Sequence, residues 1–256
     1  MSFSTVLLVG KVALVTGGGS PYGIGRSLVL ALAQAGAKAV YATDLTLTNI
    51  PSLQKEVIDS GSSCQIHAKR LDVGSEEQTV AVLKEILSEQ GLYPALFCNV
   101  PSNLDYLVGR TLQNTEVKDY DFAISVMQRS FFLALKYGGQ ALATTSSSKP
   151  SSGGSIIVTS SMADVNGAVS DISYSTAKAA VASMVKPGAV QLAASHIRVN
   201  SIAPGFVRTS IVATSASTFS GNAFNEKLDT EASKVAFDNT IEPIEITNIG
   251  VFLVSD

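Results

Sequence analysis

The sequence predicts an α/β fold, a single domain built on a doubly wound parallel sheet. Two observations support this prediction. Short apolar segments of strand length alternate along the chain with longer amphipathic segments of helix length. The apolar segments show little polar alternation, which is typical of parallel strands buried on both faces. A length of 256 residues with 46% hydrophobic residues suits one domain, expected to cover residues 1–256.

Charge and composition exclude several classes of protein. Charged residues make up 15% of the chain and the net charge is −3, which excludes a disordered chain and a basic nucleic-acid binder. Two cysteines and two histidines suit neither a disulfide framework nor a metal site. Apolar runs stay short of the ~20 residues of a membrane span, and the N-terminus lacks signal-peptide features. We therefore expect a cytoplasmic protein without a membrane or nucleic-acid partner.

The first part of the chain predicts four strands, each followed by a helix. The first strand is indicated by β-branched and small apolar residues bounded by glycines, and Gly36 is typical of a helix end. The four strands are expected at 11–16, 39–43, 64–70 and 95–98. The helices that follow them are expected at 23–36, 51–60, 75–90 and 117–144.

The rest of the chain continues the alternation. A Ser/Gly/Pro-rich loop at 144–154 precedes a strand at 155–159, and a helix at 172–194 precedes a strand at 197–201. Right-handed crossovers between such strands give a doubly wound, Rossmann-like sheet. Residues 210–235, rich in Ser, Thr, Ala and Asn, predict a partly helical substrate loop rather than a second domain.

A glycine-rich turn connects the first strand to the first helix. Glycines let the backbone turn tightly and approach a pyrophosphate, while the helix N-terminus supplies N–H donors. The expected cofactor-binding residues of this turn are Gly17, Gly19, Tyr22, Gly23 and Ile24. A merely structural turn is the alternative, and the strand–turn–helix context disfavours it.

An acidic residue, Asp44, closes the second strand about 20 residues after this turn. A carboxylate there can accept hydrogen bonds from ribose hydroxyls and would repel a 2′-phosphate. No Lys or Arg lies in the turn or just after Asp44. The sequence therefore favours NAD(H) as the cofactor, and NADP(H) stays the alternative.

Tyr174 and Lys178 open the helix after the fifth strand, and their i,i+4 spacing puts both side chains on one face. An ammonium near a phenol favours the phenolate, so we expect Lys178 to lower the pKa of Tyr174 and make it a general acid or base. Ser161, at the end of the fifth strand, could polarise a substrate carbonyl.

These features together resemble the short-chain dehydrogenase/reductase family over nearly the whole chain. The matching motifs are GKVALVTG at 10–17, GIG at 23–25, Leu71-Asp72-Val73, Ser160-Ser161, YSTAK at 174–178 and VNSIAPG at 199–205. The resemblance implies that Tyr174 donates a proton, that Ser161 positions the substrate oxygen and that Lys178 holds the nicotinamide ribose.

The resemblance also implies the rest of the cofactor site. Asp72 and Val73 would border the adenine, and Asn99 would follow the fourth strand beside the cofactor. The residues implied at the nicotinamide end are Pro204, Gly205, Val207 and Thr209. Family members commonly form homodimers or homotetramers through helices that match 117–144 and 172–194 here.

The chain also departs from the family pattern. Its glycine turn is two residues longer, and Pro101 stands where the family has Asn-Asn-Ala-Gly. Met127 replaces the family's fourth catalytic residue, an Asn, and a thioether cannot take over an amide's hydrogen bonds. Either the change is tolerated with a slower proton relay, or the reaction no longer needs a proton on oxygen. Asp164 stands where the family has a small residue facing the substrate. Pro101, Met127, Ser161 and Asp164 are therefore the expected substrate-pocket residues.

Three functions remain open. The first is an oxidoreductase that acts on a carbonyl or alcohol of a small molecule. The second is a reductase of C=N⁺ groups in which Asp164 stabilises the cation or pairs with Arg129; this combination resembles the fungal members that act as bifunctional reductase and Diels–Alderase in prenylated indole alkaloid assembly. In that hypothesis Asp164 and Arg129 are also catalytic residues. The alternative is that Asp164 is a solvated loop residue and that Arg129 lies on the surface without a catalytic role. The third is a non-catalytic dinucleotide sensor.

The last segment, 243–256, matches the family's last long helix. The family pattern continues with a further strand at the sheet edge. We therefore expect that edge strand to be absent from this chain.

Overall fold

The computed structural model describes residues 7–91, 96–99, 111–167, 170–209, 233 and 240–255, and of 96–99 it describes the backbone. Six parallel strands form one sheet in the order β3-β2-β1-β4-β5-β6. The strands are β1 (Val12–Thr16), β2 (Ala39–Asp44), β3 (Gln65–Arg70), β4 (Leu96–Asn99), β5 (Gly154–Thr159) and β6 (Ile197–Ile202). The order extends outward from β1 in one direction and from β4 in the other, which confirms the predicted doubly wound fold.

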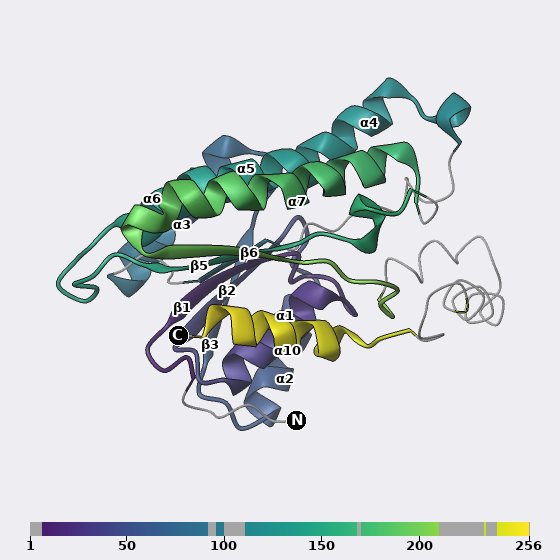
Figure 1. The fold of residues 1–256 in the computed structure, drawn as a ribbon. Helices are drawn as coiled ribbons and strands as arrows, with labels where there is room; N and C mark the ends of the chain where they lie inside the picture. Colours follow the sequence, from purple (N-terminus) through teal and green to yellow (C-terminus); the bar gives the residue numbers. More distant parts are fainter. Residues whose placement is uncertain are drawn as a thin grey trace.

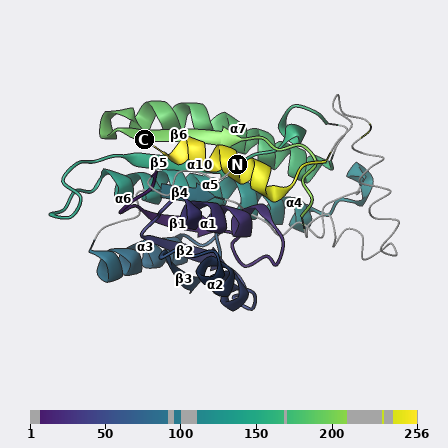
Figure 2. The same ribbon diagram turned by 90° about the horizontal axis from the view of Figure 1, so that it is seen from below.

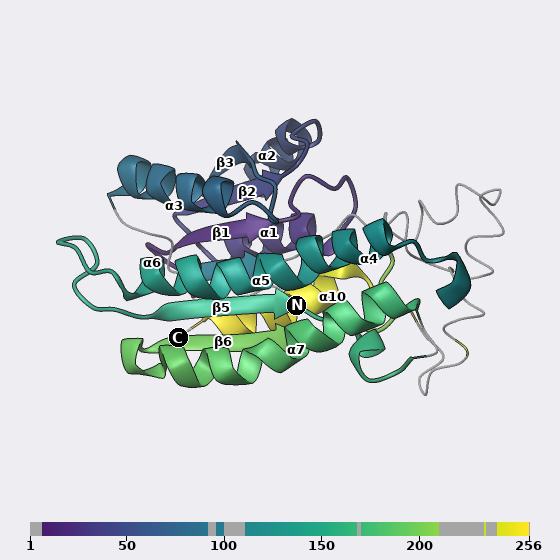
Figure 3. The same cartoon turned by 90° about the horizontal axis from the view of Figure 1, so that it is seen from above.

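Two helical layers cover the sheet (Figure 1). The lower layer, which faces the viewer in Figure 2, contains α1 (Ile24–Gln34), α2 (Ile50–Asp59) and α10 (Pro243–Val254). The upper layer, seen from above in Figure 3, contains α3 (Glu76–Gln90), the helical segment 117–143 and α7 (Ile172–Leu192). Among the described helices, none has the length and apolar character needed to cross a membrane.

Strand β1 shows why the apolar segments lack alternation. All of its side chains are at most 1% exposed, because helices cover both faces of the sheet. Ala13 and Val15 pack in the core under α1, whereas Val12 and Leu14 pack in the core under α3 and the upper helices. Each face of the strand therefore meets its own apolar environment, as expected for a central parallel strand.

The long helix expected at 117–144 is helical from 117 to 143, but it is not a uniform α-helix. It runs through α4 (Val117–Ala123), η2 (Ile124–Arg129), α5 (Ser130–Leu133), η3 (Ala134–Gly138) and α6 (Gly139–Ala143). The segments η2 and η3 are π-helical. A π-turn shifts the phase of the side chains that follow it, and such turns are frequent at functional sites. Periodicity alone did not predict them.

Short 3₁₀ turns complete the described elements: η1 (Leu112–Asn114), η4 (Met162–Asp164) and η5 (Ala193–Ser195). The expected substrate loop at 210–235 lies outside the described residues apart from residue 233, and Pro101 lies outside them as well. Within the described part of the chain, β6 is an edge strand of the sheet.

Two glycines let the segment 117–143 and α7 approach closely. A Cβ at Gly188 of α7 would lie 2.9 Å from Leu135 Cδ2, and a Cβ at Gly139 of α6 would lie 2.8 Å from Leu192 Cδ2. Both distances are shorter than ordinary van der Waals contact. The close approach of the two helices therefore depends on the missing side chains.

We expect Gly188→Val to lower the free energy of unfolding by about 1–3 kcal/mol, because a β-branched side chain would overpack this contact. Urea denaturation of both proteins measures the change. Ser183→Val, at an exposed position of the same helix, is the matched control. Equal stabilities of the Gly188→Val and Ser183→Val variants would contradict this packing.

Candidate functional site

The glycine-rich turn lies between β1 and α1, at the carboxyl edge of the sheet. Gly17 has a φ of +71°, a conformation that favours glycine. The Gly19 N–H donates to Asp44 Oδ2 at 2.9 Å, and the Gly19 carbonyl accepts from Asn49 Nδ2 at 2.9 Å. Both backbone polar groups of Gly19 are therefore bound, the N–H to the last residue of β2 and the carbonyl to the N-cap residue of α2.

The turn also packs too closely for side chains. A Cβ at Gly25 would lie 2.2 Å from the Gly17 carbonyl oxygen, and a Cβ at Gly19 would lie 2.5 Å from the Thr46 carbonyl oxygen. Helix α1 begins at Ile24 with Gly23 as its N-cap, so no N-cap side chain occupies its first N–H groups. A glycine cradle that opens onto an uncapped helix N-terminus fits a dinucleotide pyrophosphate.

Asp44 ends β2 beside this turn. Besides the Gly19 contact, its Oδ1 accepts the N–H of Leu45 at 2.7 Å. Asp72 follows β3, where its Oδ1 accepts the N–H of Gly74 at 2.9 Å. Val73 packs against the upper core. The acidic residues predicted for the adenosine end therefore lie after two neighbouring strands.

The structure adds a cation at this end that the sequence analysis missed. Arg70 pairs with Asp44 in the β2–β3 register, and its Nε donates to the Leu45 carbonyl at 3.2 Å. The turn and the residues just after Asp44 do lack a basic residue. The guanidinium comes instead from the neighbouring strand, and only the register between strands could reveal it.

A second group gathers at the carboxyl end of β5. Tyr174 lies in the first turn of α7, where Asp171 caps the helix by accepting the Tyr174 N–H at 2.9 Å. Ser161, which caps η4 just after β5, is hydrogen-bonded to the Tyr174 side chain. Lys178 lies one turn further along α7, with its Nζ 5.6 Å from the centre of the Tyr174 ring. The structure therefore brings together the three residues predicted for catalysis.

The electrostatics of Tyr174 differ from the sequence expectation. Burial raises the pKa of Tyr174, and the charges of Asp164 and Asp171 raise it further, while the hydrogen bond with Ser161 partly offsets them. The expectation that Lys178 lowers this pKa is therefore wrong in this structure. Desolvation and two carboxylates dominate, and both favour the neutral phenol over the phenolate.

Lys178 is itself buried, with 2% of its surface exposed. Its Nζ donates to the Thr159 carbonyl at 2.7 Å. Burial lowers the pKa of Lys178 from 10.5 to about 8, and the negative charge of Asp164 opposes this change. The ammonium form still prevails at neutral pH.

Asp164 ends η4 and lies half-buried near this group. Its Oδ2 is 2.9 Å from the hydroxyl of Ser160, which is buried and also lies 3.2 Å from the Lys178 carbonyl. The carboxylate acts on the pKa of both Tyr174 and Lys178. Asp164 is therefore part of the electrostatic environment of the site rather than an isolated loop residue.

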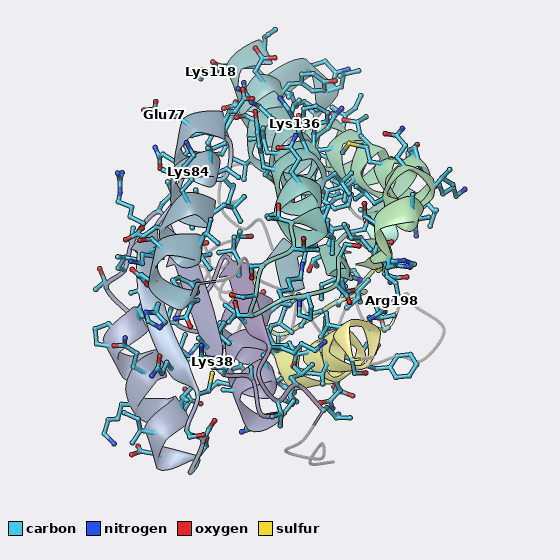
Figure 4. All side chains as sticks on the ribbon, turned by 90° about the vertical axis from the view of Figure 1, so that its left-hand side faces the viewer. Lys38, Glu77, Lys84, Lys118, Lys136 and Arg198 are labelled. Carbon is cyan, nitrogen blue, oxygen red and sulfur yellow. The ribbon has the colours of Figure 1, made fainter. Side chains whose placement is uncertain are left out.

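Arg129 lies elsewhere. It is exposed at the end of η2, and its charge acts on Glu76. Hydrogen bonds from Tyr137 and Lys136 lower the pKa of Glu76, and the charges of Lys136 and Arg129 add to this effect. Figure 4 shows Lys136 on this outer surface beside α3. The structure therefore does not bring Arg129 to Asp164, and the surface interpretation of Arg129 describes its position.

Met127 lies within η2 and is fully buried. It packs with Ala123, Ala177 and the partly buried Tyr174. The residue that replaces the family's Asn therefore does lie beside Tyr174. It presents apolar atoms where an amide would offer hydrogen bonds.

The segment after β6 passes close to η4. The Met162 N–H donates to the Pro204 carbonyl at 2.9 Å, and Val207 forms a parallel bridge with Ile241. Gly205 faces the Met162 sulfur, and Thr209 is buried. The segment predicted for the nicotinamide end therefore borders the Ser161 loop. Asn99 ends β4 opposite Val158 of β5, and its side chain lies outside the described residues.

Comparison with known proteins agrees with this geometry. A family model described as enoyl-(acyl carrier protein) reductase matches residues 17–256. The 3-oxoacyl-(acyl-carrier-protein) reductase FabG of Thermotoga maritima is 30% identical over 250 residues, which cover 97% of this chain and 92% of that protein. The chain belongs to the short-chain dehydrogenase/reductase (SDR) family. It is thus an NAD(P)-dependent oxidoreductase.

Other SDR proteins are similar to this one. The (+)-cis,trans-nepetalactol synthase NEPS2 of Nepeta racemosa is 30% identical over 202 residues, covering 79% of this chain and 72% of that protein. The L-sorbose reductase of Gluconobacter frateurii, solved with NADPH and L-sorbose, has a TM-score of 0.85 at 21% identity and covers 100% of this chain and 92% of its own. This last likeness shows the shared fold.

Several residues of the SDR site were not predicted from the sequence. Asp171 could have been found, because an Asp just before a helix is a typical N-cap. Asn49 reaches the site through a tertiary contact that no local pattern indicates. Ser160 belongs to a matching motif, but its contacts with Asp164 and the Lys178 carbonyl were not predicted. Two more residues were also not predicted. Glu242 accepts a hydrogen bond from Tyr22 of the glycine turn, and the charge of Arg208 acts on Tyr22.

We expect Lys178→Met to inactivate the SDR but to raise its free energy of unfolding at pH 7 by about 2 kcal/mol, because the buried ammonium opposes folding. The native pKa of Lys178 lies below its unfolded value, so this penalty is fully present below pH 8 and disappears as the pH rises from about 8 to 10.5. Urea denaturation at pH 7 and pH 9.5 measures the stability difference between the two proteins and its change with pH.

Lys136→Met, at an exposed ammonium, is the control for this comparison. The expectation fails if Lys178→Met is less stable than wild type at pH 7. It also fails if the stability difference stays constant with pH.

Proposed function

We propose that this SDR reduces a carbonyl or iminium group of a small organic substrate. The observation that supports this most directly is the grouping of Ser161, Tyr174 and Lys178 at the carboxyl end of β5, with the Lys178 Nζ 5.6 Å from the centre of the Tyr174 ring. A protonated phenol is the form that can give a proton to a substrate oxygen. Burial raises the pKa of Tyr174, which is in keeping with reduction as the proposed direction of reaction.

In carbonyl reduction, a bound nicotinamide would supply the hydride that adds to the substrate carbon. The oxygen becomes an alkoxide unless a proton arrives, and Tyr174 would donate that proton. The Ser161 hydroxyl, hydrogen-bonded to Tyr174, would hold the oxygen within reach. The positive charge of Lys178, fixed by the Thr159 carbonyl, would hold the ribose and stabilise the phenolate that forms.

A second candidate is reduction of a cyclic iminium, with a bifunctional reductase/Diels–Alderase as its extended form. Adding hydride to a C=N⁺ carbon needs no proton on oxygen, so the apolar Met127 beside Tyr174 would not impair it. The Asp164 carboxylate would stabilise the substrate cation. One relative is named as a nepetalactol synthase rather than as a reductase or dehydrogenase, which is in keeping with a family member whose role extends beyond reduction. Arg129, which is exposed, takes no part in this proposal, and a non-catalytic sensor is disfavoured by the assembled Ser161, Tyr174 and Lys178.

For the cofactor, members of the family bind NAD(P)(H). We propose that Asp44 makes NAD(H) the favoured form, because a carboxylate at the end of β2 beside the glycine turn would repel a 2′-phosphate. Arg70, on the neighbouring strand, is the residue through which NADP(H) would be accommodated.

The proposed assembly is a homodimer or a homotetramer. The exposed apolar side chains Phe122 and Phe132 on segment 117–143, and Val190 on α7, lie on the helices that the family uses for this purpose. Gel filtration that gives a monomer would contradict it. Localisation in the cytoplasm remains a prediction from the sequence.

Substitutions at Tyr174 and Asp164 separate the two candidate reactions. If the enzyme reduces carbonyls, we expect Tyr174→Phe to lower kcat by about 10²- to 10³-fold and Asp164→Asn to have a smaller effect. If it reduces iminium ions, Asp164→Asn should lower kcat/KM more than Tyr174→Phe does. Steady-state rates on a panel of carbonyls and cyclic iminium ions measure this.

The combination of effects decides between the functions. The hypothesis that the enzyme reduces iminium ions fails if Tyr174→Phe abolishes turnover while Asp164→Asn does not. Tight NADH binding with no turnover on a broad panel would support the sensor.

The cofactor preference gives a separate prediction. Fluorescence titration should give wild type a lower Kd for NADH than for NADPH. Asp44→Asn should lower the ratio of the NADPH Kd to the NADH Kd by about tenfold, because the substitution removes the charge that repels the 2′-phosphate. Asp59→Asn, at the end of α2, is the matched control. Equal affinities in wild type would show that Asp44 does not select the cofactor.

A further inference from the structure

Three polar side chains from distant parts of the chain meet at the rim of the glycine turn. The hydroxyl of Tyr22, in the turn, donates to Glu242 Oε2 at 2.5 Å. The other carboxylate oxygen of Glu242 lies 3.6 Å from Nε of Arg208, which comes from the segment after β6. We call Tyr22, Glu242 and Arg208 the clasp.

Two members of the clasp are fixed by their own elements. Glu242 is the N-cap of α10, where it forms a capping box with Glu245. The Arg208 N–H donates to the Ile241 carbonyl at 2.9 Å, and Arg208 Nε donates to Thr240 Oγ1 at 2.8 Å. The start of α10 and the segment after β6 thus form one unit.

Tyr22 connects that unit to the glycine turn. It belongs to the Ser20-Pro21-Tyr22 stretch, the part of the turn that is longer than the family pattern. About half of its surface is exposed, so its ring adds little to the core. Its hydrogen bond to Glu242 is therefore the main feature that distinguishes it from a phenylalanine at the same position.

The charges within the clasp offset one another. Glu242 raises the pKa of Tyr22 through their hydrogen bond, and Arg208 lowers it by its charge, so the three groups interact electrostatically. A lone carboxylate at the rim would repel the pyrophosphate expected in the turn. The guanidinium of Arg208 beside Glu242 offsets that repulsion.

We propose that the clasp sets the distance between the two ends of the cofactor site, and that Tyr22 is its positioning residue. The glycine turn is expected at the pyrophosphate, and Val207 and Thr209 at the nicotinamide end, on either side of Arg208. Holding the turn to this segment before the cofactor arrives reduces the ordering that binding requires. The proposal rests on the dinucleotide site described above.

Tyr22→Phe tests the clasp directly. We expect the Kd of NADH, measured by fluorescence titration, to rise about tenfold. The Kd of NADPH should rise by the same factor, because both cofactors contain the pyrophosphate. The KM for NADH should rise with Kd, and kcat should fall by less than KM rises. The melting temperature should not change.

Tyr137→Phe is the matched control. Its hydroxyl also donates to a glutamate, Glu76, but on the outer surface of the upper helical layer. This variant loses the same type of contact away from the turn, so its Kd for NADH should equal that of wild type.

A double substitution tests whether Tyr22 acts through Glu242. Glu242→Ser keeps a side chain that caps α10 but is too short to reach Tyr22. Glu242→Ser also removes a charge from the rim, so the test is the effect of Tyr22→Phe within that background: the Tyr22→Phe/Glu242→Ser pair should have the same Kd for NADH as Glu242→Ser alone. Effects that multiply, or a Kd within twofold of wild type in Tyr22→Phe, would overturn the clasp.

These outcomes are distinct from a failure of the proposed reaction. Wild type that binds NADH tightly and reduces no substrate would contradict the reaction alone, because the titrations require no turnover. Wild type that binds neither NADH nor NADPH would overturn both.

Discussion

The ammonium of Lys178 is buried at the carboxyl end of β5, and the arrangement of the site depends on it. Its Nζ donates to the Thr159 carbonyl, and its own carbonyl lies 3.2 Å from the Ser160 hydroxyl. Helix α7 is thereby tied at two points to the residues around the end of β5, which places Tyr174 over η4. Burial of a charge opposes folding, so a cation held at this point lowers the free energy of unfolding.

The same low-dielectric environment governs Tyr174. A buried phenol resists ionisation, and the two carboxylates at its side add to that resistance, so this site favours the neutral tyrosine. An SDR site that favours the phenolate would be suited to removing a proton from an alcohol. The same tyrosine and lysine, here Tyr174 and Lys178, can therefore serve either the reduction or the oxidation according to the charges around them.

Features with a local cause could be predicted from the sequence. The apolar run of β1, the glycine turn and the helical spacing of Tyr174 and Lys178 each depend on neighbouring residues. The π-turns in 117–143, the approach of Arg70 to Asp44 and the raised pKa of Tyr174 depend on helix packing, strand register and burial. These are properties of the assembled fold, and no window of sequence contains them.

Met127 has a consequence for the supply of protons. A phenol that gives one up in each cycle must receive another from water. Met127 and Ala177 are apolar neighbours of Tyr174, whereas Ser161 and Asp164 are its polar neighbours and belong to the loop that holds the 90% exposed Val165. A proton that reaches Tyr174 through the loop after β5 therefore passes polar groups, whereas one that came past Met127 would meet only apolar atoms.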